Sequence, residues 1–135
     1  MIDAQSQSAI TPFWRYSLKF YGQSGVSDAC IALQDGFGVD VNLLLYLFWL
    51  ASEGRQLTAD EVKALDDKVK AVELEAERMQ QEALYQFTRS GPPLGKAAEP
   101  PAAARGNIAA LAGALGKTFP KASVDVLIGG FTGAA

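Results

Sequence analysis

The chain has 135 residues, of which 49% are hydrophobic and 20% charged, a balance typical of one globular domain rather than a disordered chain. Its formal net charge of −3 argues against a surface built for nucleic acid or anionic membrane, since both partners require clustered Lys and Arg. The single cysteine, Cys30, excludes an internal disulfide and favours a reducing, cytoplasmic location. Histidine is absent, which removes Ser-His-Asp, Cys-His and His-based zinc chemistry.

The first part of the chain predicts an arm followed by two helices. Residues 1–10 contain no apolar run and no Lys or Arg, so we expect a flexible arm and no signal peptide. Thr11 and Pro12 are typical of a helix start, and the helix predicted over residues 12–21 carries a broad aromatic band. A second helix is predicted over residues 26–36, where glycines end it.

Residues 41–51 are apolar on nearly every side and follow Asp40, which can cap a helix. A helix that is apolar all round is buried all round, so we expect this one to form the axis of the domain and to end at Gly54. The apolar run would extend roughly 16 Å as a helix, against about 30 Å for the core of a bilayer. It therefore cannot span a membrane.

Thr58 and Glu61 have the spacing of a capping box and predict a long helix over residues 59–87. Its apolar residues recur in steps of three and four and form a narrow heptad seam, while its other faces are mainly acidic. Such a seam docks on the domain's own core or pairs with another helix, and a homodimer through this helix is one prediction. The exposed residues predicted for an interaction are Val69, Val72, Ala76 and Met79.

The predicted boundaries are an arm over 1–10, a helical core domain over 11–88, a Pro/Ala/Gly linker over 89–106 and a short helical segment over 107–135. In the last segment Asn107 is expected to cap a helix that ends at residue 115. The apolar piece at 122–131 fits a helix or a strand, and we favour the helix because a lone strand would have no partner. The predicted fold class is all-α: a small bundle of about five or six helices around one buried central helix, with a loosely tethered C-terminal segment.

Three groups of residues form spaced motifs: FW..S...Y at 13–21, GV...C..LQD..G.DVNLLL...WLA at 25–51 and ELEAER at 73–78. In this combination the chain resembles an uncharacterised family of small proteobacterial proteins that is known only as a domain of unknown function. The chain departs from that family between the central helix and ELEAER, where the family carries a longer insertion with a Trp and an Arg-rich stretch. The resemblance implies a small bacterial helical protein and supplies no activity, catalytic residue or cofactor.

Four polar residues border the loop that leads into the central helix: Gln34, Asp35, Asp40 and Asn42. Two carboxylates and two amides so close together fit an acid/base pair or an oxygen-ligand metal site. Each group also has an ordinary structural role, capping a helix or tying a loop, and we favour that interpretation. Arg15, among the aromatic residues of the first helix, fits an anion site or, in the favoured interpretation, a ring or carboxylate partner such as Asp35.

No catalytic signature is present, and we predict no catalytic residue, no cofactor and no metal. The favoured function is a non-enzymatic module that binds another protein. The alternative is a binder of a hydrophobic small molecule or lipid between the aromatic first helix and the central helix. A second alternative is an enzyme that uses Asp35, Asp40 and Arg15.

Overall fold

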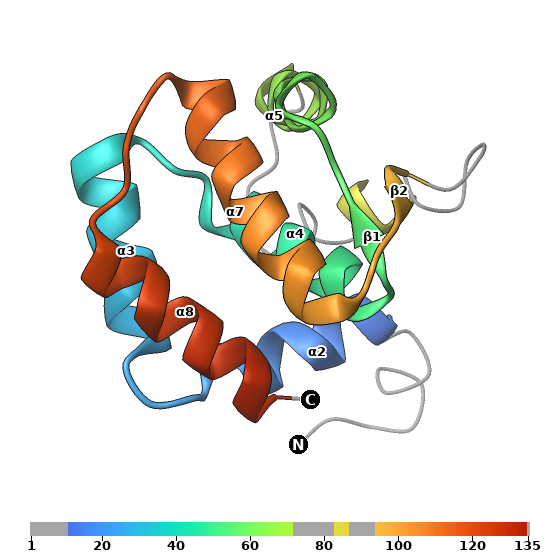
Figure 1. Ribbon diagram of the computed structural model, residues 1–135. Helices are drawn as coiled ribbons and strands as arrows, with labels where there is room; N and C mark the ends of the chain where they lie inside the picture. The colour runs from blue at the N-terminus through green and yellow to red at the C-terminus, as the bar shows by residue number, and fades with distance from the viewer. Residues whose placement is uncertain (1–10, 72–82, 87–93, 135) are drawn as a thin grey trace.

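The computed structural model describes residues 11–71, 83–86 and 94–134. Its helices are α2 (Pro12–Tyr21), α3 (Val26–Phe37), α4 (Val41–Ser52), α5 (Ala59–Ala71), α7 (Pro100–Leu115) and α8 (Lys121–Gly133). Residues 83–86 are also helical. Two short strands, β1 (Arg55–Gln56) and β2 (Lys96–Ala97), pair antiparallel at the edge of the bundle (Figure 1). The prediction of a small all-α bundle is confirmed, while the arm predicted over residues 1–10 lies outside the described residues.

Helix α4 forms the axis of the bundle, as predicted. Its first turn is fixed by Asp40, whose Oδ1 accepts a hydrogen bond from the backbone N–H of Leu43 at 3.0 Å. Every residue from Asn42 to Ala51 is buried, because α2, α3, α5 and α7 all pack against this helix. Within the described ranges, no helix has the length and apolar character needed to cross a bilayer.

Helix α2 covers one side of α4 through aromatic contacts. Thr11 caps it, as predicted, by accepting a hydrogen bond from the backbone N–H of Trp14 at 3.0 Å. Phe13 meets Tyr46 edge-on with ring centroids 5.2 Å apart, and Phe20 meets Phe48 at 4.9 Å. Such pairs add about 0.5–1.5 kcal/mol each to the area that they bury.

Helix α5 begins with the predicted capping box. The backbone N–H of Thr58 donates to Glu61 Oε1 at 2.9 Å, and the backbone N–H of Glu61 donates to Thr58 Oγ1 at 3.2 Å. The first part of the heptad seam, Val62 and Leu65, is buried against the bundle, so this part of the seam packs internally. Residues 72–82 of the predicted long helix lie outside the described residues.

The linker prediction is wrong over residues 100–106. Helix α7 begins at Pro100 rather than Asn107 and lies across α4 and α5 (Figure 1). Proline suits the first turn of a helix, and Ala is the best helix former, so this stretch is locally helical. It lacks an obvious apolar stripe because alanines such as Ala103 and Ala104 form the buried face. The C-terminal region is consequently part of the core and not a loosely tethered segment.

The prediction that Asn107 caps a helix is wrong. Asn107 lies inside α7 with 1% of its surface exposed. Its Nδ2 donates to the backbone oxygens of Leu47 at 2.8 Å and Arg55 at 3.1 Å. Its Oδ1 accepts from the backbone N–H of Leu57 at 2.8 Å. One buried side chain thus joins α7 to α4 and to the β1 segment.

Helix α8 confirms the helical interpretation of the last apolar piece. It packs against α2, α3 and α7, and Phe131 reaches Phe48 of the central helix with ring centroids 5.8 Å apart. Gly130 permits the close approach to α3: a Cβ at this position would lie 2.3 Å from Cγ2 of Val26. Glycine is therefore required here by packing rather than by backbone conformation.

Candidate functional site

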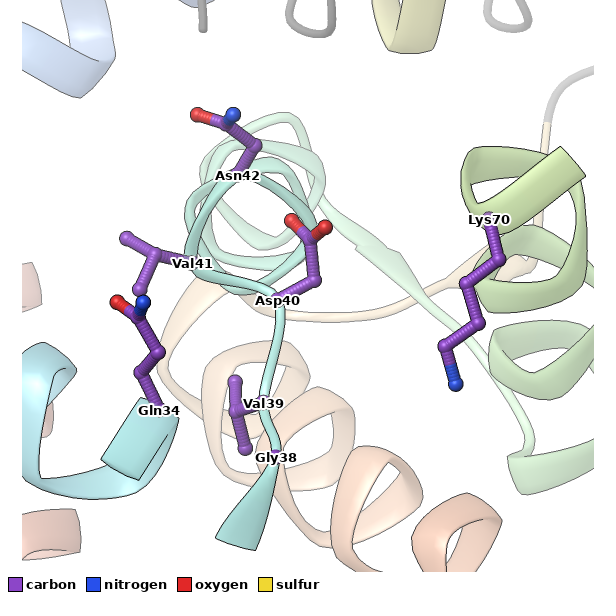
Figure 2. Close-up of a pocket in the computed structure, with 7 residues that line it drawn as sticks. All are labelled: Gln34, Gly38, Val39, Asp40, Val41, Asn42 and Lys70. Atoms are coloured by element: carbon purple, nitrogen blue, oxygen red, sulfur yellow. The ribbon is translucent and has the colours of Figure 1, made fainter. Parts of the chain in front are cut away.

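The corner between α3 and α4 forms a polar hollow of about 350 Å³. Gly38 ends α3 in the left-handed region at φ 68°, which glycine adopts without strain, and its N–H donates to the carbonyl of Gln34 at 3.1 Å. The chain then extends through Val39 to the cap residue Asp40. Figure 2 shows this segment between Gln34, at the end of α3, and Lys70, on α5.

The structure brings together three of the five predicted polar residues. Gln34, Asp40 and Asn42 line the corner hollow, whereas Arg15 and Asp35 do not. Asp40 has the structural role predicted for it, as the cap of α4. Asn42, in the first turn of α4, is buried.

Lys70 lines the same hollow and was missed by the sequence analysis. Its Nζ pairs with Asp66 Oδ2 at 2.8 Å, and Asp66 is buried although its partner is exposed. The hydrogen bond to Asp66 raises the pKa of Lys70, and the nearby charges of Asp66, Asp67 and Asp40 act in the same direction. The sequence signal for this pair is Asp66, which directly follows Leu65 and lies four residues before Lys70.

Two charged side chains of the corner already have partners within the described residues. Asp40 is used as a helix cap, and Lys70 is paired with a buried carboxylate. Among the residues that the structure describes, no group of three or more His, Cys, Asp or Glu side chains is placed to hold a metal ion. At this corner Asp40 therefore has the structural role of a helix cap.

A second hollow, of about 130 Å³, lies between α2 and α4 and is mainly apolar. Trp14, Leu18 and Tyr21 border it from α2, and Leu45 borders it from α4. Ser17 also lines this hollow and is 3% exposed, and its hydroxyl has no hydrogen-bond partner among the described residues. A buried hydroxyl without a partner is energetically unfavourable, and this oxygen is shielded from solvent behind the wall of the hollow.

Residues 12–71 match the family DUF2390, described as a protein of unknown function. The predicted resemblance to a domain of unknown function is confirmed for this part of the chain. Neither the comparison with curated proteins nor that with solved structures gave a match. Every residue that lines either hollow belongs to the DUF2390 segment, whereas α7 and α8 lie outside it.

The structure describes one of the four interaction residues that were predicted on the long helix beginning with α5. Val69, the member within the DUF2390 segment, is only 8% exposed and packs in the core with Val62 and Leu65, so it is not available to a partner. The remaining three, Val72, Ala76 and Met79, lie outside the described residues.

The Cys30 thiol and the Tyr16 hydroxyl of the DUF2390 segment are shielded from solvent. Burial raises the pKa of the Cys30 thiol to about 12, so the thiol stays protonated and unreactive at neutral pH. Burial also raises the pKa of the Tyr16 phenol, whose hydroxyl likewise has no hydrogen-bond partner in the structure. Tyr16 stacks on Phe20 with ring centroids 5.8 Å apart, which places it in the packing of α2 rather than in either hollow.

Proposed function

We propose that this protein is a non-enzymatic module that binds another protein through the outer surface of α2. This surface, called the α2 face below, consists of Trp14, Leu18 and Tyr21, which follow one another at helical spacing. The observation that carries the proposal is Leu18, a large apolar side chain that is 58% exposed at the edge of the apolar hollow. Exposed apolar residues that gather beside a hollow are typical of protein-interaction sites.

The hollow between α2 and α4 fits the anchoring side chain of a partner. Its volume of about 130 Å³ is well below the 300–1,000 Å³ or so of small-molecule pockets, and this argues for one inserted side chain over a lipid or drug-sized ligand. Its mainly apolar lining, with Leu18, Val41 and Leu45, favours an apolar or aromatic anchor.

Charge around the α2 face favours an acidic partner. Arg15 and Lys19 are exposed on α2, and neither forms an ion pair within the part of the chain that the structure describes. On a protein of net charge −3, these two cations make α2 locally basic. Complementary charge at the rim of an interface mainly speeds association and selects the partner.

The experiment compares two exposed apolar positions. Leu18→Glu changes the α2 face, and Ile31→Glu makes the same change on α3, where Ile31 is 46% exposed and does not line the hollow. Both variants should keep the fold with similar melting temperatures, because each side chain is about half exposed. Tagged proteins are then used for affinity purification from the native cells, with identification by mass spectrometry. We expect the partner to be lost with Leu18→Glu and kept with Ile31→Glu, and equal recovery with both variants would contradict the proposal.

The other predicted properties remain proposals. The absence of Arg15 and Asp35 from the hollow of Asp40 supports the non-enzymatic assignment. A cytoplasmic location is supported by Cys30, which is a buried free thiol. The homodimer proposal now depends on Val72, Ala76 and Met79, and light scattering of the purified protein tests it.

A further inference from the structure

A third hollow, called the α7–α8 groove below, lies on the outside of α7 where the chain turns into α8. It has a volume of about 400 Å³ and an apolar floor that includes Ile108 and Ala112 from α7, Phe119 from the connection and Val124 from α8. Phe119 is held in place by its edge-on contact with Phe37, with ring centroids 5.6 Å apart. The volume falls in the range of about 300–1,000 Å³ in which small ligands bind.

Two cations line this groove. Arg105, on α7, and Lys117, just after its end, are both exposed, and neither has an ion-pair partner among the described residues. The nearest acid along α8, Asp125, is already paired with Lys121 at 2.7 Å. The groove therefore combines an apolar floor with two cations that have no carboxylate within ion-pair distance among the described residues.

We propose that the α7–α8 groove binds a small amphipathic carboxylate, namely an unbranched alkyl chain that ends in a carboxylate group. The alkyl chain would lie along Ile108 and Phe119, where it leaves water, and the carboxylate would pair with Arg105 or Lys117. A neutral chain would gain only the first of these contributions, and a cationic chain would be repelled.

This site is independent of the proposed protein-binding function. None of the residues that line the groove belongs to the α2 face, and all of them lie outside the DUF2390 segment. Either proposal can fail while the other stands.

The test uses the full-length protein and decanoate, with decanol and decyltrimethylammonium as ligands that keep the chain and change the head group. Binding is followed by isothermal titration calorimetry and by NMR shifts of methyl groups in Ile108 and Val124. We expect saturable binding of decanoate with perturbation of these methyl groups, weaker binding of decanol and no binding of decyltrimethylammonium. Equal binding of decanoate and decanol, or shifts located elsewhere, would overturn the proposal.

Matched variants test the two parts of the site. The double variant Arg105→Ala/Lys117→Ala should weaken decanoate binding about tenfold or more, since charge-assisted hydrogen bonds to the carboxylate are lost, and should leave decanol binding unchanged. Ala109→Trp fills the groove from an exposed position of α7 and should abolish binding, whereas Ala102→Trp, exposed on the same helix but outside the groove, should not. Unchanged affinity in both the double variant and Ala109→Trp would overturn the proposal.

Discussion

The buried Asn107 allows the sharpest test of the fold. Its amide makes three hydrogen bonds, to the backbone of Leu47, Arg55 and Leu57, at 2.8, 3.1 and 2.8 Å. The variant Asn107→Ala removes all three and leaves the N–H of Leu57 without its partner in a buried region. We expect this variant to fold with clearly reduced stability.

The size of the effect follows from these contacts. Three hydrogen bonds at about 1 kcal/mol each amount to about 3 kcal/mol, and an unsatisfied buried N–H adds to that figure. Alanine is the better helix former by up to about 0.7 kcal/mol, which offsets a small part of the loss. With about 1–3 kcal/mol for the unsatisfied N–H, the expected decrease in the free energy of unfolding is about 3–5 kcal/mol, a large fraction of the 5–15 kcal/mol or so that a domain has.

Urea denaturation followed by circular dichroism measures this decrease, with the slope of the transition as a check that only stability has changed. Ala102→Asn, at an exposed position of α7, is the control for placing asparagine in this helix, and it should lose less than about 1 kcal/mol. Asn107→Asp keeps the acceptor but points oxygen at two carbonyl groups, so it should be at least as unstable as Asn107→Ala. A loss below about 1 kcal/mol in Asn107→Ala would refute the assignment of Asn107 as the link between α7 and the central helix.

Three further predictions concern packing and titration. Gly130→Ala should destabilise the protein by about 1–3 kcal/mol because its Cβ has no room, whereas Gly129→Ala, with open space around it, should be neutral or stabilising in the same urea assay. Cys30 should react with a disulfide reagent at pH 8 much more slowly in the native protein than in urea, and rapid reaction of the native thiol would contradict its burial. Because the pKa of Cys30 is raised to about 12 in the native state, the native protein holds the proton more tightly than the unfolded chain. The protein should therefore lose stability as the pH rises from about 9 toward 12. Lys70→Met should lose roughly 1 kcal/mol at pH 7, because it leaves a buried carboxylate unpaired, whereas Lys63→Met breaks only an exposed pair and should lose almost nothing. Because the pKa of Lys70 is raised, this contribution is complete at neutral pH and should disappear as the pH rises through the titration of lysine, and equal losses in the two lysine variants would contradict it.

The elements that could be predicted from the sequence are those whose signals are local. Thr11, Asp40 and the Thr58/Glu61 box each cap a helix with their own side chain, so each position could be identified from a few neighbouring residues. The burial of α4 could be predicted because apolar residues cover its whole circumference, a pattern that only a central helix satisfies.

The start of α7 could not be predicted because alanine gives no clear signal. Prolines, alanines and glycines at 89–106 have the composition of a linker, and only tertiary packing shows that Ala103 and Ala104 are buried. Asn107 was interpreted through its local preference for helix caps, but its three partners are all 50 or more residues away in the sequence. A long-range polar contact of this kind leaves no periodic pattern in the sequence from which it could be predicted.

The candidate site shows the same division between local and distant information. Gln34, Asp40 and Asn42 are close in sequence, and their grouping at one corner followed from the two helices that meet there. Lys70 enters that corner only because α5 folds back beside α4, which the spacing along the chain does not specify. The hollow beside Ser17 likewise depends on how α2 is placed on α4, so the sequence indicated an aromatic helix but not an opening in its packing.

The residues proposed to bind a partner and the helix that completes the core lie in different parts of this chain. Both hollows near α4 are built from the DUF2390 segment, yet α4 is also covered by α7, which lies outside that segment. Because Asn107 connects these two parts in the core, a change at Asn107 is expected to lower stability without touching the residues of the α2 face. A change at the exposed Leu18 has the reverse effect, since its side chain contributes to the surface and little to the core. Substitutions on the α2 face can thus test function with folding held constant, whereas a fragment limited to residues 12–71 would lack the helix that covers its central axis.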